Sequence, residues 1–220
     1  MSFSQEHDPP LREWIPYRSK YLTELLRAEG IEGGSGDKCM TCGSVVTSPS
    51  ALIKCRDCVN GSLECEKCCV RLHQQNPFHR VDRWNGLHFE HTTLKDCGLK
   101  LMLGHKQSGT CSYAIAGPLD FVVLHTNGFH PVNVCFCQCD QLAASGDRIQ
   151  QLLRAELYPA TTTDPTTACT FRLLEQFHIL SSQSKVSAYD FYLSLEMITD
   201  HSGVTRSQAC ISLLSSYPIY

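Results

Sequence analysis

CMTCGSVVTSPSALIKCRDCVNGSLECEKCCVRLHQQNPFHR, residues 39–80, contains seven of the fourteen cysteines in the chain. Six of them form pairs whose members have two residues between them. These pairs are Cys39 with Cys42, Cys55 with Cys58, and Cys65 with Cys68, and the histidines His73 and His79 follow. A two-residue gap lets one tight turn direct both thiolates at one tetrahedral ion. The stretch therefore predicts two zinc sites with four ligands each.

The eight ligands can divide between the two ions in two ways. In sequence order, one ion takes the first two cysteine pairs and the other takes the third pair with both histidines. In the interleaved alternative, zinc 1 is held by Cys39, Cys42, Cys65 and Cys68, and zinc 2 by Cys55, Cys58, His73 and His79. The order of three cysteine pairs and two histidines resembles the ZZ and B-box zinc modules, which use this cross-brace, whereas a RING finger ends in a cysteine pair. We therefore favour the interleaved division.

Both predicted ions are structural rather than catalytic. A segment of about 40 residues cannot build an adequate hydrophobic core, so metal binding contributes folding energy directly. All eight positions are filled by protein ligands, which leaves no open position for a reactive water molecule. Cys69 is the spare thiol, and we expect it to pack as a small apolar residue in a short helix over residues 69–75.

Length and composition exclude several other classes of protein. The chain has 220 residues, of which 42% are hydrophobic and 19% charged, with a formal net charge of −3. This composition is globular rather than disordered or collagenous, and no run approaches the ~20 apolar residues of a membrane span. The first ten residues do not resemble a signal peptide. We expect a nuclear or cytoplasmic protein in a reducing compartment, not a secreted one, with its thiols available to metal.

A third ligand group follows farther along the chain. The runs 119–125 and 129–136 are largely apolar and flank Thr126-Asn127-Gly128, which predicts a β-hairpin. Because a hairpin returns the chain to its start, Cys111 should lie beside the cysteines after its second strand. We predict a third zinc held by His105, Cys111, Cys137 and Cys139. Cys135 can instead pack on the sheet, and His125 and His130 are competing ligands.

The predicted fold is a small zinc-stabilised α+β protein with five segments. Residues 1–38 hold an amphipathic helix over 18–29 and a Gly-rich link, 39–80 form the two-zinc cross-brace, and 81–143 form a strand-rich segment with the hairpin and third zinc. Residues 144–203 are expected to be helical, with helices over 146–157 and 166–180 and a third that begins at Ser187. Asp164-Pro165 is the expected cap of the second of these helices. Residues 204–220 form a divergent tail.

The ordered set of motifs resembles the CxC-type cysteine cluster at the N-terminal side of the Kyakuja-Dileera-Zisupton (KDZ) transposases of fungi. Besides the three cysteine pairs, the matching residues are Trp14, 21–30, His73-x3-Pro77-x-His79-Arg80, 84–89, Leu103-Gly104-His105-x5-Cys111, Asn127-Gly128-x-His130, Cys137-x-Cys139, 158–161, Pro165, 171–178 and 184–192. The resemblance covers roughly residues 12–203. It implies a transposon origin, and it places the RNase H-like catalytic core downstream of this region.

The resemblance and the residues together predict a protein that is not an enzyme. The chain ends at Tyr220 before such a core could fit, and its acids, such as Asp120 and Asp190, form no trio that could hold two Mg²⁺ ions. We expect a truncated, non-catalytic module that mediates protein interaction. Direct DNA binding and an inactive transposon relic are the alternatives. No membrane or small-molecule substrate is expected.

Charge ranks protein above DNA as the expected partner. Between Cys39 and His79 there are four basic residues, Lys54, Arg56, Lys67 and Arg71, against three acids, Asp57, Glu64 and Glu66, which gives a net charge of +1. DNA recognition needs clustered lysine and arginine for phosphate contacts. A protein-binding module has no such requirement.

Overall fold

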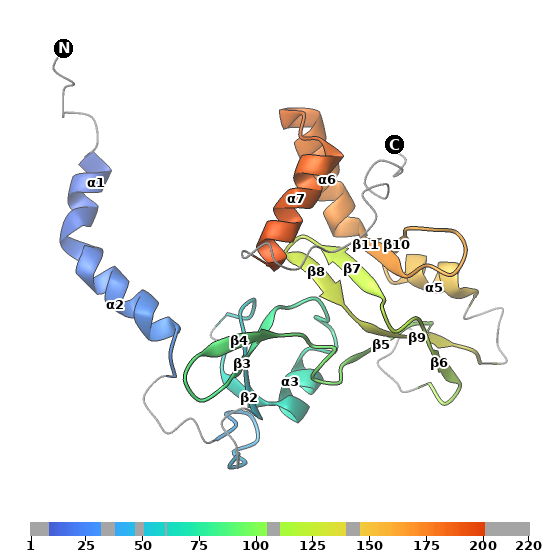
Figure 1. Cartoon of the computed structure of the whole chain (residues 1–220), viewed down its shortest axis with the longest axis horizontal. Coiled ribbons are helices and arrows are strands. Elements are labelled where there is room, and N and C mark those ends of the chain that lie inside the picture. The colour runs from blue at the N-terminus through green and yellow to red at the C-terminus, as the bar shows by residue number, and fades with distance from the viewer. Residues whose placement is uncertain are drawn as a thin grey trace.

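The computed structural model describes residues 9–31, 38–46, 51–59, 61–104, 111–139 and 146–200 of the chain. It shows a mixed α+β protein with three small sheets and an N-terminal helical arm (Figure 1). No helix in the described ranges combines the length and the apolar character needed to cross a bilayer.

The helical arm consists of α1 (Pro9–Trp14), a 3-10 turn η1 (Ile15–Tyr17) and α2 (Arg18–Ala28). The helix expected over 18–29 is therefore present. The tighter turn lies at Pro16, which has no N–H to donate and interrupts the α-helical hydrogen bonds. Every residue from Pro10 to Glu29 is exposed, and the end of α2 contacts the first sheet where Lys54 Nζ donates to the Ala28 carbonyl at 2.7 Å.

The first sheet has the strand order β2-β1-β3-β4. Its strands are β1 (Leu52–Cys55), β2 (Leu63–Cys65), β3 (Val81–Trp84) and β4 (Phe89–Thr92), and the helix α3 (Glu66–Leu72) follows β2 directly. The expected helix over 69–75 thus begins three residues earlier. Because β3 pairs with β1, the expected boundary between residues 80 and 81 runs through the middle of this sheet. Ile53, Val81 and Cys69 belong to its small buried core.

Two further sheets follow, with the orders β5-β9-β6 and β10-β11-β7-β8. The strands of the three-stranded sheet are β5 (Lys100–Met102), β6 (Ala114–Ala116) and β9 (Asn133–Cys137). Those of the four-stranded sheet are β7 (Val122–His125), β8 (Gly128–Pro131), β10 (Leu157–Pro159) and β11 (Thr167–Thr170). A core that includes Phe121, Val134 and Leu152 joins the two sheets.

The predicted hairpin forms, but its second strand is shorter than expected. His125 pairs with Gly128 across a two-residue loop of Thr126 and Asn127. Pro131 ends β8, and the Val132 N–H bonds the carbonyl of Phe121 one step farther in the same register. The chain then enters β9 in the other sheet. The expected run 129–136 is therefore two strands in two sheets, and Pro131 lies on β8, an edge strand, where a missing N–H is tolerated.

The segment 144–203 is mixed rather than helical. Its helices are α5 (Arg148–Arg154), α6 (Phe171–Ser184) and α7 (Ala188–Thr199), and β10 and β11 lie between the first two. The helix expected from residue 166 begins only at Phe171 and is capped by Thr170, whose hydroxyl accepts from the Leu173 N–H, so Asp164-Pro165 is not its cap. β11 forms there because it lies between β7 and β10 in the sheet. The cap expected at Ser187 is present.

Helices α6 and α7 complete the C-terminal part of the fold. Figure 1 shows them standing together above the end of the sheet that contains β7 and β8. Leu173 and Leu174 of α6 and Leu195 of α7 pack with Leu124 and Phe129 of the hairpin. The apolar stripes of these helices are core, as their spacing predicted.

Candidate metal centres

The first ligand group contains Cys39, Cys42, Cys65 and Cys68, and the four sulfurs lie within 4.8 Å of one another. Gly43 has a φ of +68°, a left-handed conformation that suits glycine, and its N–H bonds the Cys39 carbonyl at 2.8 Å. This closes the tight turn of the first pair. Cys65 occupies the N-cap position of α3 and Cys68 lies within its first turn, so the helix fixes the third cysteine pair.

Hydrogen bonds give the thiols of this group different acidities. Bonds with Ser44 lower the pKa of Cys42 to about 6, whereas burial and the neighbouring thiols raise the pKa of Cys68 to about 12. Glu64 is buried beside them, with Oε2 3.2 Å from both Cys39 Sγ and the Thr41 backbone nitrogen. Burial raises the pKa of Glu64, but its hydrogen bonds outweigh this and the net shift is downward. Glu64 thus orients the first turn, a role that its place in the sequence did not reveal.

The second ligand group contains Cys55, Cys58, His73 and His79. Cys58 Sγ lies 3.5 Å from His73 Nε2 and 3.3 Å from His79 Nδ1. The other ring nitrogen of His73, Nδ1, lies 2.8 Å from the Cys69 carbonyl at the end of α3. Donation from Nδ1 to this carbonyl leaves Nε2 with a lone pair that can bind a metal. A hydrogen bond of this kind fixes the tautomer and the ring orientation of metal-binding histidines.

The proximity of the side chains follows the interleaved division and not the sequential one. The first and third cysteine pairs meet, and the second pair meets the two histidines. The pairing of β1 with β2 and β3 explains this pattern. It brings Cys55, at the end of β1, next to Val81 and hence near His79, while Cys65 at the end of β2 lies opposite Leu52.

The donor atoms fit a zinc ion. With Zn–S near 2.3 Å and Zn–N near 2.0 Å, ideal tetrahedral angles require S–S separations of about 3.7 Å and S–N separations of about 3.5 Å. Cys42 Sγ and Cys65 Sγ are 3.9 Å apart, and Cys55 Sγ is 3.5 Å from His79 Nδ1. Thiolate and imidazole are also the donors that Zn²⁺ prefers. Metal occupancy and metal identity remain predictions.

A polar network ties the second group to the hairpin of the C-terminal sheets. Asp57, between Cys55 and Cys58, accepts from the backbone N–H and the guanidinium of Arg80, each at 2.6 Å. Burial raises the pKa of Asp57, but the hydrogen bonds and charge of Arg80 lower it by a larger amount. The net shift is downward, so the carboxylate stays ionised. Asn127, in the hairpin loop, donates to Asp57 at 3.0 Å and to the Phe78 carbonyl at 2.9 Å.

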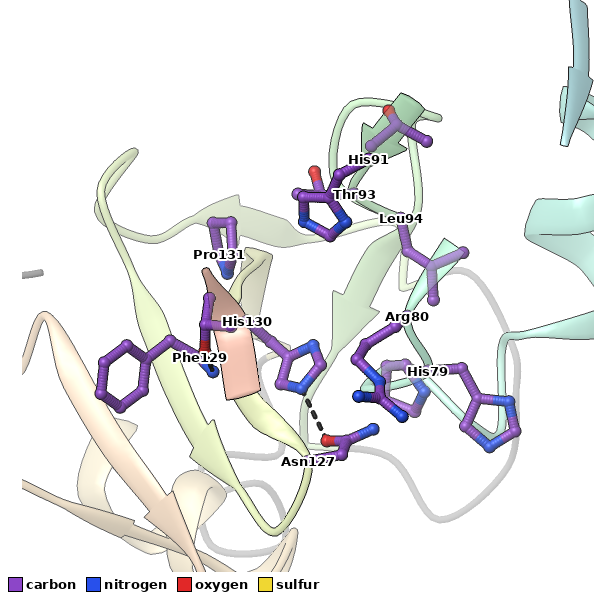
Figure 2. Close-up of a pocket in the computed structure, with 12 residues that line it drawn as sticks. His79, Arg80, His91, Thr93, Leu94, Asn127, Phe129, His130 and Pro131 are labelled. Atoms are coloured by element: carbon purple, nitrogen blue, oxygen red, sulfur yellow. Dashed lines mark hydrogen bonds between the residues drawn. The ribbon is translucent and has the colours of Figure 1, made fainter. Parts of the chain in front are cut away.

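The same asparagine also holds His130 of β8. His130 Nε2 lies 2.8 Å from Asn127 Oδ1 at the wall of a small pocket, which His79, Arg80 and His91 also line (Figure 2). Burial lowers the pKa of His130 to about 3, so the ring is neutral and donates this hydrogen bond. The hairpin loop thus connects two parts of the chain that are about 50 residues apart in sequence.

The third group contains Cys111, Cys137 and Cys139. Cys111 Sγ lies 3.5 Å from Cys137 Sγ and 3.4 Å from Cys139 Sγ. These cysteines meet because β6 pairs with β9, which places Ala114 opposite Cys137. The juxtaposition was predicted, but its cause was not, since the predicted hairpin β7–β8 belongs to the other sheet. His105, the predicted fourth ligand, lies outside the described residues.

Gln151 of α5 clamps the backbone beside this third group. Its side chain accepts from the Cys137 N–H at 2.9 Å and donates to the Cys137 carbonyl at 2.9 Å and the Gly146 carbonyl at 3.0 Å. Gln151 is only 2% exposed. In the sequence, this role is indicated only by a glutamine among the apolar residues of a predicted helix. That signal does not identify the backbone groups to which the glutamine bonds.

The alternative ligands of the third site are engaged elsewhere. His125 Nδ1 lies 2.9 Å from Thr170 Oγ1, and His130 bonds Asn127. Both rings contact Phe78, next to the second group. Cys135 is buried within β9 and opposite Ala116, outside the cysteine group. Cys69 packs in the core of the first sheet, as expected for a spare thiol.

Comparison with known proteins identifies the part of the chain that carries the third group. No curated protein and no solved structure matches the chain. One family model matches residues 94–203, which is half of the 220 residues, and its description is a CxC2-like cysteine cluster associated with KDZ transposases. The matched range contains Cys111, Cys137 and Cys139 and the clamp by Gln151. The chain therefore belongs to the family of CxC2-like cysteine clusters associated with KDZ transposases.

Proposed function

We propose that this protein is a non-catalytic, zinc-stabilised module that binds another protein in the nuclear setting of transposition. The observation that carries the proposal is the pairing of the arginines around the first sheet. Arg56 pairs with Asp82, Arg80 with Asp57, and Arg83 with Glu66. Each guanidinium already has a carboxylate partner, so phosphate contacts would have to displace these ion pairs.

Three structural zinc ions would stabilise this module. The first two sites have four protein donors each, in the cross-brace arrangement that ZZ and B-box modules use, which leaves no position for a reactive water. For the third site, His105 is the proposed fourth donor. Its preceding residue Gly104 lies so close to Cys137 that an added Cβ would come 2.5 Å from Cys137 Cβ. The chain thus reaches the cysteine group at this point.

The composition of the ligand groups supports a non-catalytic role. Among the described residues, the groups able to hold a metal contain cysteine and histidine without any carboxylate. Phosphoryl transfer by two Mg²⁺ ions requires carboxylate ligands. Asp164 instead pairs with Arg148, and Asp190 accepts a hydrogen bond from the hydroxyl of Ser187, the N-cap residue of α7.

The turns of the zinc modules present apolar side chains to solvent. Met40, between Cys39 and Cys42, is 71% exposed, and Val59, next to Cys58, is 92% exposed. Because the metal sites fix these turns, such side chains can contact a partner without an ordering cost. Buried apolar anchors are typical of protein interfaces, whereas DNA interfaces are strongly basic.

The proposal is tested by two binding measurements on the zinc-loaded chain. Titration with a 30-base-pair duplex at several salt concentrations should show no salt-dependent affinity. Binding through phosphate contacts would instead make the logarithm of the binding constant fall linearly with the logarithm of the salt concentration. Chemical cross-linking in nuclear extract should capture proteins that a Met40→Glu, Val59→Glu variant with unchanged zinc content fails to capture. Steep salt-dependent DNA binding, or identical capture by the variant, would overturn it.

A further inference from the structure

We propose that the N-terminal helical arm, residues 9–28, is the surface through which two copies of this chain associate. The arm carries eight large apolar side chains, each between 43% and 66% exposed: Leu11, Trp14, Ile15, Tyr17, Tyr21, Leu22, Leu25 and Leu26. Figure 1 shows most of the arm to one side of the three sheets, and its C-terminal end contacts β1 through the bond from Lys54 to the Ala28 carbonyl. This inference uses residues other than those of the proposed function and goes beyond it.

The apolar side chains lie along the arm in a continuous stripe. The rings of Trp14 and Tyr21, seven residues apart, are stacked with centroids 6.2 Å apart and an interplanar angle of 8°. The ring centroids of Tyr17 and Tyr21 are 6.5 Å apart. Leu25 follows Tyr21 by four residues, and Leu22 and Leu26 lie on the flank of the same stripe. Positions four and seven residues apart share one helical face, so the stripe runs from α1 through the 3-10 turn to the end of α2.

The area of this stripe matches what a stable dimer requires. Large side chains have about 150–250 Å² each to bury, so half exposure of eight of them leaves on the order of 800 Å². That value equals the area that each partner contributes to an interface of standard size. It also exceeds the apolar patch of about 300–600 Å² that a monomer usually exposes. Self-association covers this stripe on both copies at once, because a two-fold interface uses the same patch on each.

Charge favours pairing of two arms in opposite directions. The half 10–20 carries Arg12, Arg18 and Lys20 with Glu13, a net charge of +2. The other half, taken with Glu29 at the C-cap of α2, carries Glu24, Glu29 and Arg27, a net charge of −1. An antiparallel pair places the basic half of one arm beside the acidic half of the other. A parallel pair would place the two basic halves together. The arm is therefore complementary to a second copy of itself.

The test is the mass of the full zinc-loaded chain in solution, measured by sedimentation equilibrium between 1 and about 100 μM. The wild type should have twice the 24.6 kDa of one chain at the upper concentrations. Leu25→Glu should raise the dissociation constant at least about 100-fold, because the charge enters the interface twice. The matched control is Thr23→Glu, on the polar side of α2, which should leave the mass unchanged.

Zinc content and circular dichroism establish that each variant keeps its fold, since residues 10–28 are exposed and outside the cores. A monomeric wild type at 100 μM would overturn the proposal, as would a dimer that persists in Leu25→Glu. Equal dissociation by Thr23→Glu would also overturn it, because the effect would then not depend on the apolar stripe. Binding of a monomeric chain to lipid vesicles through the arm would assign the stripe to a membrane surface instead.

Discussion

Replacement of Gln151 by leucine should remove the third metal while leaving the other two in place. The leucine side chain has a similar size but cannot form the three hydrogen bonds to the Cys137 N–H, the Cys137 carbonyl and the Gly146 carbonyl. An unsatisfied buried backbone group costs about 1–3 kcal/mol. With both Cys137 groups deprived of Gln151, the local cost is about 2–6 kcal/mol, and loss of such outer contacts weakens metal binding about 10–100-fold.

Competition with a chromogenic chelator measures this effect. The wild type should release about three zinc ions in total. In Gln151→Leu, one of these ions should be released at a 10–100-fold lower chelator concentration. Gln150→Ala is the matched control, since Gln150 lies on the same helix and its side chain accepts from the Asp147 N–H at 3.0 Å, within the capping box of α5. If Gln151→Leu and Gln150→Ala release zinc alike, or if all three ions leave together, the clamp does not hold the third site.

Three further outcomes follow from the same structure. Cys65→Ser should unfold the first sheet, with loss of about one zinc and of its circular dichroism, whereas Cys69→Ser should keep all zinc, because Cys69 packs in the core and belongs to none of the ligand groups. Zinc affinity should rise with pH between 6 and 8, since binding must displace protons from Cys68 and His73. The pKa of the Cys68 thiol is raised to about 12, and bonds with Cys69 raise the pKa of His73 to about 9. An affinity that does not change with pH in competition titrations would contradict this. His130 has a pKa of about 3 in the fold against about 6.5 when unfolded, so its contribution to stability is present above pH 6.5 and is lost as pH falls from 6.5 toward 3; denaturant titrations of His130→Gln should show a shallower loss of stability over this range than those of the wild type.

The parts of the fold that the sequence predicts well are those with local physical signals. Cysteine pairs with two intervening residues mark tight turns, and Asn127-Gly128 marks the hairpin because glycine accepts a φ of +129° there. Ser187 marks the start of α7 because its hydroxyl bonds the Asp190 N–H. In each case a few neighbouring residues contain the whole cause.

The parts that the sequence does not predict depend on pairing between distant segments. Thr167–Thr170 becomes the strand β11 because it pairs in parallel with β7, about 45 residues earlier, and this partner overrides the cap signal of Asp164-Pro165. Cys111 meets Cys137 through the pairing of β6 with β9 and not through the hairpin. No local pattern records either partner.

The positions of the three ligand groups explain why so short a chain depends on them. The buried side chains form three separate small cores, one for the first sheet and two for the C-terminal sheets. The second group lies where Asn127 joins the first sheet to the hairpin, and the third lies where Gln151 joins β9 to α5. A buried polar network is costly unless every member is held in place, and metal ions bound by these groups would fix the backbone around both networks. We therefore predict that metal binding does at these two junctions what continuous apolar packing does in a larger domain, and that metal removal separates the cores before it unfolds the helices α6 and α7.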